Sequence, residues 1–240
     1  MTSSPRALQR SHHRPIRVLI TLFPDFNTFD ANGPIEVLSQ ANGNSSSSMF
    51  IITIASSNPL TRSIENISIA RDISLRDALA RVEEWDIVLL PGGAWEEISK
   101  MLNLHWERKE ESGFVEFLDQ YADKKDGLIL TVCTGSLFLA GLRKLDGRTA
   151  TTHWGYLPTQ KKLCADNNSN TKIVRARWVD SDEKGLPRLI TAGGVACGID
   201  ATFHLLELIA GPELVEKVAR AIDYQRREEE LQEDYVIPAL

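Results

Sequence analysis

The sequence predicts an α/β fold: a doubly wound, mostly parallel sheet with helices on both faces. Two observations predict this fold. Short apolar runs rich in β-branched residues alternate with segments whose apolar residues recur at helical spacing. Two of the runs end abruptly, at Gly92 and at Cys133, as expected where parallel strands present their carboxyl ends to a ligand. With 240 residues, 42% of them hydrophobic, the chain can bury one large core.

The first predicted strand, residues 16–23, is continuously apolar and ends at Pro24, a pattern typical of a strand buried on both faces. Further strands are predicted at residues 49–55, 85–90, 128–132, 173–179 and 189–191, with a short strand or hairpin arm at 64–69.

The first predicted helix follows Gly33, because Pro34 suits a first turn and apolar spacing continues until Asn42 and Gly43. Further helices are predicted at residues 114–121, 137–142, 199–209 and 214–222. We expect one domain over residues 15–226, a flexible tail at 1–14 and a charged tail at 227–240.

Composition narrows the class of protein. Lysine and arginine number 27 against 33 acidic residues, a formal charge of -6, and no basic run is interleaved with aromatics, so nucleic acid is not an expected partner. The polar amino-terminal stretch has no apolar core, so it predicts neither a signal peptide nor a membrane anchor. Three cysteines without CxxC or metal-ligand spacing predict no disulfide framework and no metal site. We expect a cytoplasmic protein that acts on a small molecule.

Cys133 is the candidate for covalent chemistry. It lies between a predicted buried strand and a predicted helix, where unpaired helix amides lower a thiol pKa and favour the thiolate. The backbone N–H of Thr134, with a second amide from Gly93, would form an oxyanion hole in front of the sulfur. The alternative is a small buried cysteine that only fills space.

Five segments, in this order along the chain, resemble the ThiJ/PfpI superfamily. They are FPDFNTFDANGPIEVL (23–38), LLPGG (89–93), TVCTGSLFLAGL (131–142), LDGRTATTHW (145–154) and ITAGGVACGIDATFHLLE (190–207). Within the superfamily the sequence is most similar to the isonitrile hydratase branch. The resemblance implies a flavodoxin-like fold of the class I glutamine amidotransferase type, with a nucleophile elbow at Cys133.

The resemblance also implies roles. Cys133 matches the nucleophilic cysteine, Thr134 the threonine that follows it, Asp30 the acidic residue facing the thiolate, and Gly93 an oxyanion-loop amide. The implied reaction adds water to an isonitrile to give an N-formamide, without a cofactor. A homodimer is implied as well, with apolar segments around Gly33 and Gly194 as candidate contacts.

Other members of the predicted site have alternative roles. Asp30 could instead be a helix N-cap or a charge in the first turn of a helix. His153 could be a base or only a packed side chain, and Trp154 could wall the pocket or fill core. Gly92, Gly194 and Val195 complete the predicted pocket.

Four further residues are weighed separately. His204 is expected to pack in an apolar helix, and Cys164 to be a surface or helix-end thiol. Ala196 and Cys197 depart from the hydratase pattern, which more typically has a hydroxyl residue followed by a small one. The departure puts substrate preference in doubt.

Two other functions are compatible with these residues. One is another cofactor-free thiol enzyme, such as a glyoxalase, an amidase or a natural-product pathway enzyme. The other is a non-enzymatic ligand or oxidation sensor that uses the same cysteine.

Overall fold

The computed structural model describes residues 14–109, 112–182 and 187–227. Within them a seven-stranded sheet has the order β10-β11-β7-β6-β1-β2-β5. Its strands are β1 (Ile16–Leu22), β2 (Phe50–Ser56), β5 (Ile73–Ser74), β6 (Ile87–Leu90), β7 (Leu128–Thr131), β10 (Trp178–Ser181) and β11 (Arg188–Ala192). Two small two-stranded sheets pair β3 (Leu60–Arg62) with β4 (Ser68–Ala70) and β8 (Thr149–Ala150) with β9 (Lys172–Ile173).

The main sheet is parallel except at one edge. Pairings between β1 and β2, β1 and β6, β6 and β7, β7 and β11, and β2 and β5 are parallel, whereas β10 runs antiparallel to β11. All residues of β6, β7 and β11 are buried, which explains why their sequences are apolar without alternation. The predicted doubly wound, mostly parallel fold is confirmed.

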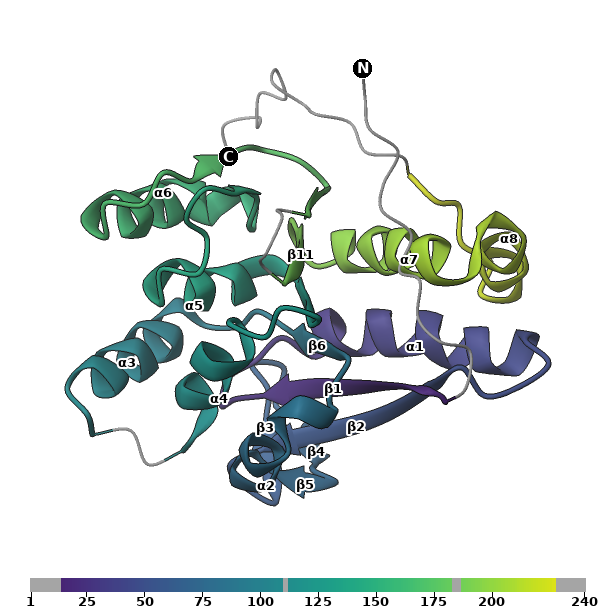
Figure 1. Cartoon of the computed structure of the whole chain (residues 1–240), viewed down its shortest axis with the longest axis horizontal. Helices are drawn as coiled ribbons and strands as arrows, with labels where there is room; N and C mark the ends of the chain where they lie inside the picture. Colours follow the sequence, from purple (N-terminus) through teal and green to yellow (C-terminus); the bar gives the residue numbers. More distant parts are fainter. Residues whose placement is uncertain (1–13, 110–111, 183–186, 228–240) are drawn as a thin grey trace.

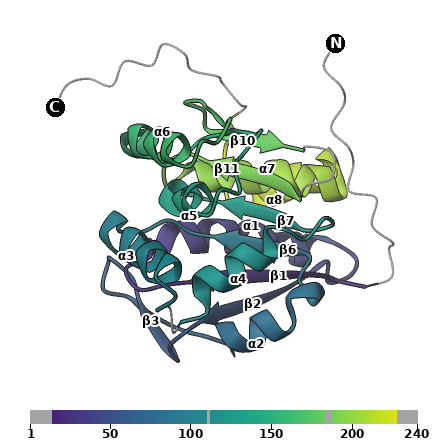
Figure 2. The ribbon, with the colours of Figure 1, turned by 60° about the vertical axis from the view of Figure 1, so that its left-hand side comes forward.

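Helices lie on both faces of the sheet (Figures 1 and 2). They are α1 (Thr28–Asn44), α2 (Leu75–Ala80), α3 (Trp95–Trp106), α4 (Phe114–Tyr121), α5 (Ser136–Gly141), α6 (Leu157–Asp166), α7 (Cys197–Ala210) and α8 (Pro212–Ala221). Helices α1, α7 and α8 pack against one another in one layer. The other layer contains α2, α3, α4 and α5, and α6 packs on α5. In that layer the rings of Phe23, Phe114 and Phe138 meet with centroids 5.1 to 5.3 Å apart.

Helix α1 begins earlier than predicted. It starts at Thr28, and Pro34 lies inside it instead of in its first turn. The reason is the cap: the side chain of Asn27 accepts hydrogen bonds from the N–H groups of Phe29 and Asp30 and so begins the helix there. Asp30 consequently lies in the first turn of the helix.

Two other predictions need correction, and three helices were not predicted. The run 173–179 is not one strand, because β9 ends at Ile173 and β10 begins at Trp178. The hairpin arms lie at β3 and β4, so most of the run 64–69 belongs to the turn between them. Helices α2, α3 and α6 were not predicted.

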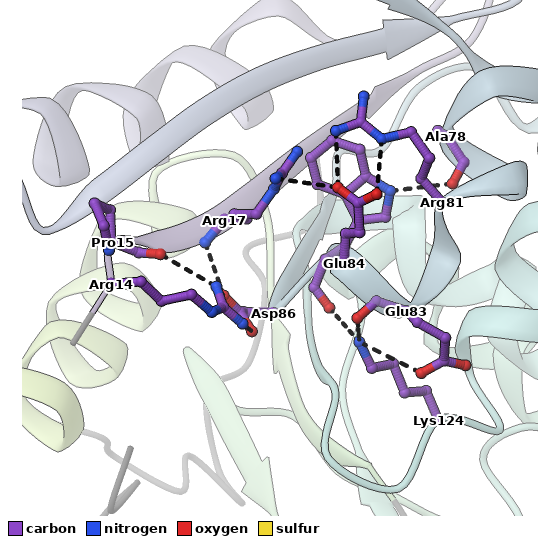
Figure 3. A network of polar contacts seen from close by, with 10 residues as sticks. Arg14, Pro15, Arg17, Ala78, Arg81, Glu83, Glu84, Asp86 and Lys124 are labelled. Carbon is purple, nitrogen blue, oxygen red and sulfur yellow. Dashed lines mark hydrogen bonds and ion pairs between the residues drawn. The ribbon is translucent and has the colours of Figure 1, made fainter. Parts of the chain in front are cut away.

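A polar network joins the amino ends of β1 and β6 (Figure 3). Arg14 donates two hydrogen bonds to Asp86, at 2.7 and 2.9 Å, and the backbone N–H of Arg17 donates to the same carboxylate. Lys124 donates to the backbone oxygens of Glu83 and Trp85. Arg14, assigned above to the amino-terminal tail, is therefore bonded to the fold. The remainder of that tail and residues 228–240 lie outside the described residues.

No helix in the described part of the chain is long and apolar enough to cross a membrane.

Candidate active site

Four connections meet beyond the carboxyl ends of adjacent parallel strands. Asp30 follows β1, Gly92 follows β6, Cys133 follows β7 and Val195 follows β11. Because the four strands are neighbours in the sheet, residues separated by more than 160 positions in the sequence come together at one edge. This is where a parallel α/β sheet places its ligand.

Cys133 occupies a sharp turn between β7 and α5. Its φ of 56° lies in the left-handed region, which residues with a side chain rarely adopt. Hydrogen bonds hold this conformation from both sides: its N–H donates to the carbonyl of Gly193 at 2.8 Å, and its carbonyl accepts from the hydroxyl of Thr152 at 2.8 Å. Gly135 completes the turn, because a Cβ there would lie 2.5 Å from the carbonyl oxygen of Leu90. The predicted elbow is present.

Asp30 is fully buried beside this turn, with 0% of its surface exposed. Its Oδ2 accepts the N–H of Gly92 at 3.0 Å, and its Oδ1 has no well-formed hydrogen bond within the described residues. The thiol of Cys133 is close enough to act on the carboxyl as a donor. The carboxyl and the thiol thus face each other, as the resemblance implied. Asp30 does not cap α1, since Asn27 does so.

The electrostatics of the Asp30–Cys133 pair do not favour the thiolate that was expected at Cys133. Burial raises the pKa of Asp30 to about 7, although the Gly92 amide and the Cys133 thiol act to lower it and Glu65 adds a small increase. Burial, together with the negative charge of Asp30, raises the pKa of Cys133 to about 12. The predicted lowering of the thiol pKa was wrong, because desolvation and Asp30 outweigh the amides at the turn. At about pH 7 the thiol is therefore protonated and the carboxyl is about half ionised, so the negative charge that the pair carries is centred on the carboxyl.

The amides that act on the sulfur are those of Thr134 and Val195. Both backbone N–H groups lower the pKa of Cys133, and so does the side chain of Thr134. Gly93 does not supply the expected amide, because its N–H donates to the Thr134 hydroxyl at 2.8 Å. The second donor therefore comes from the turn after β11 and not from the loop after β6.

Gly92 and Gly93 are required for close packing. A Cβ on Gly92 would lie 2.6 Å from both the N and Oγ1 of Thr134, and 2.9 Å from Oδ2 of Asp30. A Cβ on Gly93 would lie 2.4 Å from the carbonyl oxygen of Asp25. A side chain at Gly92 would therefore displace Thr134 or the Asp30 carboxyl, and one at Gly93 would displace the backbone of Asp25 and Phe26.

His153 lies against Gly194 at the edge of the site. A Cβ on Gly194 would be 2.8 Å from Cδ2 of His153. The Nδ1 atom of His153 accepts the N–H of Gly155 at 3.2 Å, and burial lowers the pKa of the ring, so the imidazole is neutral. Trp154 is 45% exposed and does not fill core. Whether either side chain touches a substrate stays a prediction.

The remaining singled-out residues lie elsewhere or have other contacts. Cys164 is buried in the last turn of α6, so it is a helix-end thiol but not a surface one. His204 bonds to Asp180 at 2.7 Å and stacks on Trp178, so it joins α7 to β10 instead of packing among apolar groups. The Cys197 thiol would lie 3.3 Å from a Cβ on Gly193, in the turn that holds Cys133.

Sequence reasoning missed two residues that support the site. Thr152 anchors the carbonyl of Cys133, and Glu65 binds the first turn of α1. The string Thr151–Thr152–His153 was noted for its histidine alone, and Glu65 carries no local signal. No group of three or more His, Cys, Asp or Glu side chains among residues 14–109, 112–182 and 187–227 is arranged to hold a metal ion.

Comparisons with known proteins agree with this arrangement. The sequence model of the DJ-1/PfpI family matches residues 16–208. An isonitrile hydratase of Pseudomonas putida is 28% identical over 142 residues, which is 58% of this chain and 52% of the relative; the match thus spans about half of that enzyme.

Two solved structures share the fold. Drosophila melanogaster DJ-1beta has a TM-score of 0.67 at 22% identity, covering 88% of this chain and 100% of that one. A ThiJ/PfpI family protein from Pseudomonas syringae has a TM-score of 0.70 at 17% identity, covering 90% and 77%.

Proposed function

Because this chain belongs to the DJ-1/PfpI family, we propose that its Asp30–Cys133 pair catalyses the hydration of an isonitrile to an N-formamide. The observation that supports the proposal most is the pairing of a buried carboxyl, whose pKa is about 7, with a thiol that needs a base to react. A catalytic base works best when its pKa lies near the operating pH. The similarity to the isonitrile hydratase of Pseudomonas putida supports the choice of substrate class.

The first half of the reaction forms a thioimidate. The Asp30 carboxylate takes the proton of the Cys133 thiol while the sulfur attacks the terminal carbon of R–NC. The Asp30 carboxylic acid then returns that proton to the same carbon, which gives R–N=CH–S–Cys133. The amides of Thr134 and Val195 stabilise the negative charge on sulfur while it attacks.

The second half consumes water. Asp30 takes a proton from a water molecule that attacks the thioimidate carbon and delivers this proton to the nitrogen, which restores the Asp30 carboxylate. The resulting R–NH–CH(OH)–S–Cys133 collapses as the C–S bond breaks and the hydroxyl proton leaves through Asp30 to the sulfur. The products are R–NH–CHO and the free thiol, so the sum is one isonitrile plus one water.

Other uses of the same residues receive less support. An oxidation sensor needs a thiolate at neutral pH, and the pKa of Cys133 is raised to about 12. A glyoxalase or amidase remains the second candidate among enzymes, because a base-assisted thiol also attacks carbonyl carbons.

We further propose that the protein acts in the cytoplasm and as a homodimer. Cys133, Cys164 and Cys197 are free, and a reducing compartment keeps thiols in that state. Apolar side chains near the start of α1, including Phe29 at 48% and Ile64 at 48% exposure, provide a surface for a second copy.

The test is turnover. Purified protein is mixed with one alkyl and one aryl isonitrile, and formamide is measured by mass spectrometry beside the variants Cys133→Ala and Cys164→Ala. We expect product from the wild type and from Cys164→Ala, whose replaced thiol is buried outside the site, and none from Cys133→Ala. Wild-type protein that makes no more formamide than Cys133→Ala would reject the proposal. Lactate formed from methylglyoxal would favour the second candidate instead.

A further inference from the structure

Glu65 binds across the first turn of α1 from the hairpin between β3 and β4. Its Oε1 accepts the side-chain N–H of Asn27 at 2.8 Å, and its Oε2 accepts the backbone N–H of Thr28 at 3.1 Å and the Thr28 hydroxyl at 2.5 Å. Although Glu65 is on the surface, three donors hold its carboxylate. Partial burial acts to raise its pKa, but the hydrogen bonds from Thr28 and Ser63 outweigh this and keep the pKa below its ordinary value. Glu65 is therefore ionised whenever Asp30 titrates.

The hairpin and the active-site loop are connected through one segment. Phe26 forms bridges with Ser63 of the hairpin and with Gly93. The N–H of Ile64 donates to the carbonyl of Phe26, and the N–H of Asn27 donates to the carbonyl of Gly92. The position of Glu65 is thus tied by backbone hydrogen bonds to the loop whose amide binds Asp30.

The negative charge of Glu65 acts against the positive electrostatic potential that the amides create at the amino end of α1. Unpaired amides in the first turn of a helix favour a carboxylate there and so lower its pKa. In α1, Asn27 and Glu65 occupy amides of that turn, while the Asp30 carboxyl turns to Gly92 and Cys133. Repulsion from the fixed carboxylate of Glu65 adds to the burial of Asp30 and disfavours its ionisation.

Few other ionisable groups face Asp30. Cys133 approaches from the elbow after β7, and Glu65 acts from the hairpin. Cys197, at the start of α7, is close enough to sense the charge of Asp30. Gly92 brings only its backbone. Arg62, the arginine of the hairpin between β3 and β4, donates to Asn66.

We propose that Glu65 is a positioning residue for Asp30 and shifts upward the pH range in which the Asp30–Cys133 pair transfers protons. This inference rests on the acid–base role proposed above for Asp30. The inference adds the hairpin between β3 and β4, which is remote from Cys133 in the sequence, to the active site. The Glu65 side chain acts on Asp30 and does not touch the substrate.

The experiment measures the pH dependence of Cys133 alkylation by iodoacetamide, followed by mass spectrometry of the Cys133 peptide. Since no isonitrile is involved, the result is independent of the substrate. The variants are Glu65→Gln, which keeps the shape and loses the charge, and Glu65→Asp, which keeps the charge. Glu36→Gln is the matched control, because Glu36 is an exposed carboxylate of the same helix, where it accepts a hydrogen bond from Gln40.

We expect an inflection near pH 7 in the wild type, from ionisation of Asp30. Glu65→Gln should move it down by about 0.3 to 0.5 pH unit at about 0.01 M salt, an order-of-magnitude Coulomb effect. The shift should shrink at about 1 M salt, where the Debye length is about 3 Å. Glu65→Asp and Glu36→Gln should keep the wild-type inflection.

Three outcomes would overturn the inference. The first two are an unmoved inflection in Glu65→Gln and an equal shift in Glu36→Gln. The third is slower alkylation of Glu65→Gln with no shift of the inflection, where the slower rate persists in high salt. The last would mean that Glu65 only braces the hairpin. If Glu65→Gln shifts the inflection but the wild type hydrates no isonitrile, the proposed function fails and the inference about Asp30 stands. Should Glu65→Gln not fold, the salt dependence of the wild-type inflection gives the same discrimination, and an inflection that ignores salt contradicts the inference.

Discussion

The backbone N–H of Gly92 donates to Oδ2 of Asp30 at 3.0 Å. This bond fixes a carboxyl carried by the connection after β1 against the loop after β6. The same loop is tied to Thr134 through the Gly93 N–H, at 2.8 Å. The turn that carries Cys133 and Thr134, the Asp30 carboxyl and this loop therefore form one hydrogen-bonded unit.

Asp30→Asn should abolish most turnover while preserving the fold. Asparagine retains an oxygen to accept the Gly92 N–H, but it cannot take a proton from Cys133. We expect kcat/KM for isonitrile hydration to fall by about 10²- to 10⁴-fold, the usual contribution of a general base. Steady-state kinetics and circular dichroism check this. Unchanged kinetics in a folded variant would remove the acid–base role.

The same variant should be more stable than the wild type above neutral pH. The folded-state pKa of Asp30 is raised to about 7, whereas its unfolded-state pKa is about 4. Ionisation of Asp30 therefore favours the unfolded state. The stability contributed by Asp30 is fully present below about pH 4 and is lost as the pH rises through about 7.

At pH 8 this penalty is on the order of 2–4 kcal/mol in the free energy of unfolding. Urea unfolding of wild type and Asp30→Asn at pH 4 and pH 8 measures the difference in the free energy of unfolding between the two proteins. The contributions of the other titrating groups are the same in both proteins and cancel in this difference. We expect the advantage of Asp30→Asn to be larger at pH 8 by that amount. An advantage that does not depend on pH would contradict the raised pKa.

Gly92→Ala should abolish the proposed activity and destabilise the protein. The added Cβ would lie 2.6 Å from the backbone N of Thr134, so either the loop or the nucleophile turn must move. We expect a loss of about 1–3 kcal/mol in stability, as for other overpacked sites, together with loss of turnover. Gly43→Ala is the control, since a Cβ at Gly43 meets nothing within 4 Å and alanine favours a helix. Equal effects of the two substitutions on turnover would refute the steric argument.

The central strands and the turn at Cys133 were predictable because the sequence patterns that produce them are local. The central strands are buried on both faces, so their apolar runs are continuous, and the change from strand to helix at Cys133 is visible in the sequence. The missed helix α3 also had a signal. Its buried residues Ile98, Met101 and Leu102 have helical spacing.

The parts that could not be predicted depend on tertiary contacts. The direction of the Cys133 pKa follows from burial and from Asp30, neither of which the local pattern contains. The second amide facing the sulfur belongs to Val195, because Thr134 occupies the N–H of Gly93. Glu65 lacks a motif, and only folding of the hairpin brings it to α1.

Thr152→Val should weaken the elbow without touching the reacting atoms. The Thr152 hydroxyl donates to the carbonyl of Cys133 at 2.8 Å, and both residues are buried. Valine has a similar shape but leaves that carbonyl without this donor, which costs about 1–3 kcal/mol of stability. Because Cys133 has a φ of 56°, freeing its carbonyl should let the turn relax and displace the sulfur, and kcat should fall about 10-fold. Thr152→Ser keeps the hydroxyl and should restore both quantities. A valine variant that is less stable but fully active would show that the hydroxyl stabilises the fold without positioning the nucleophile.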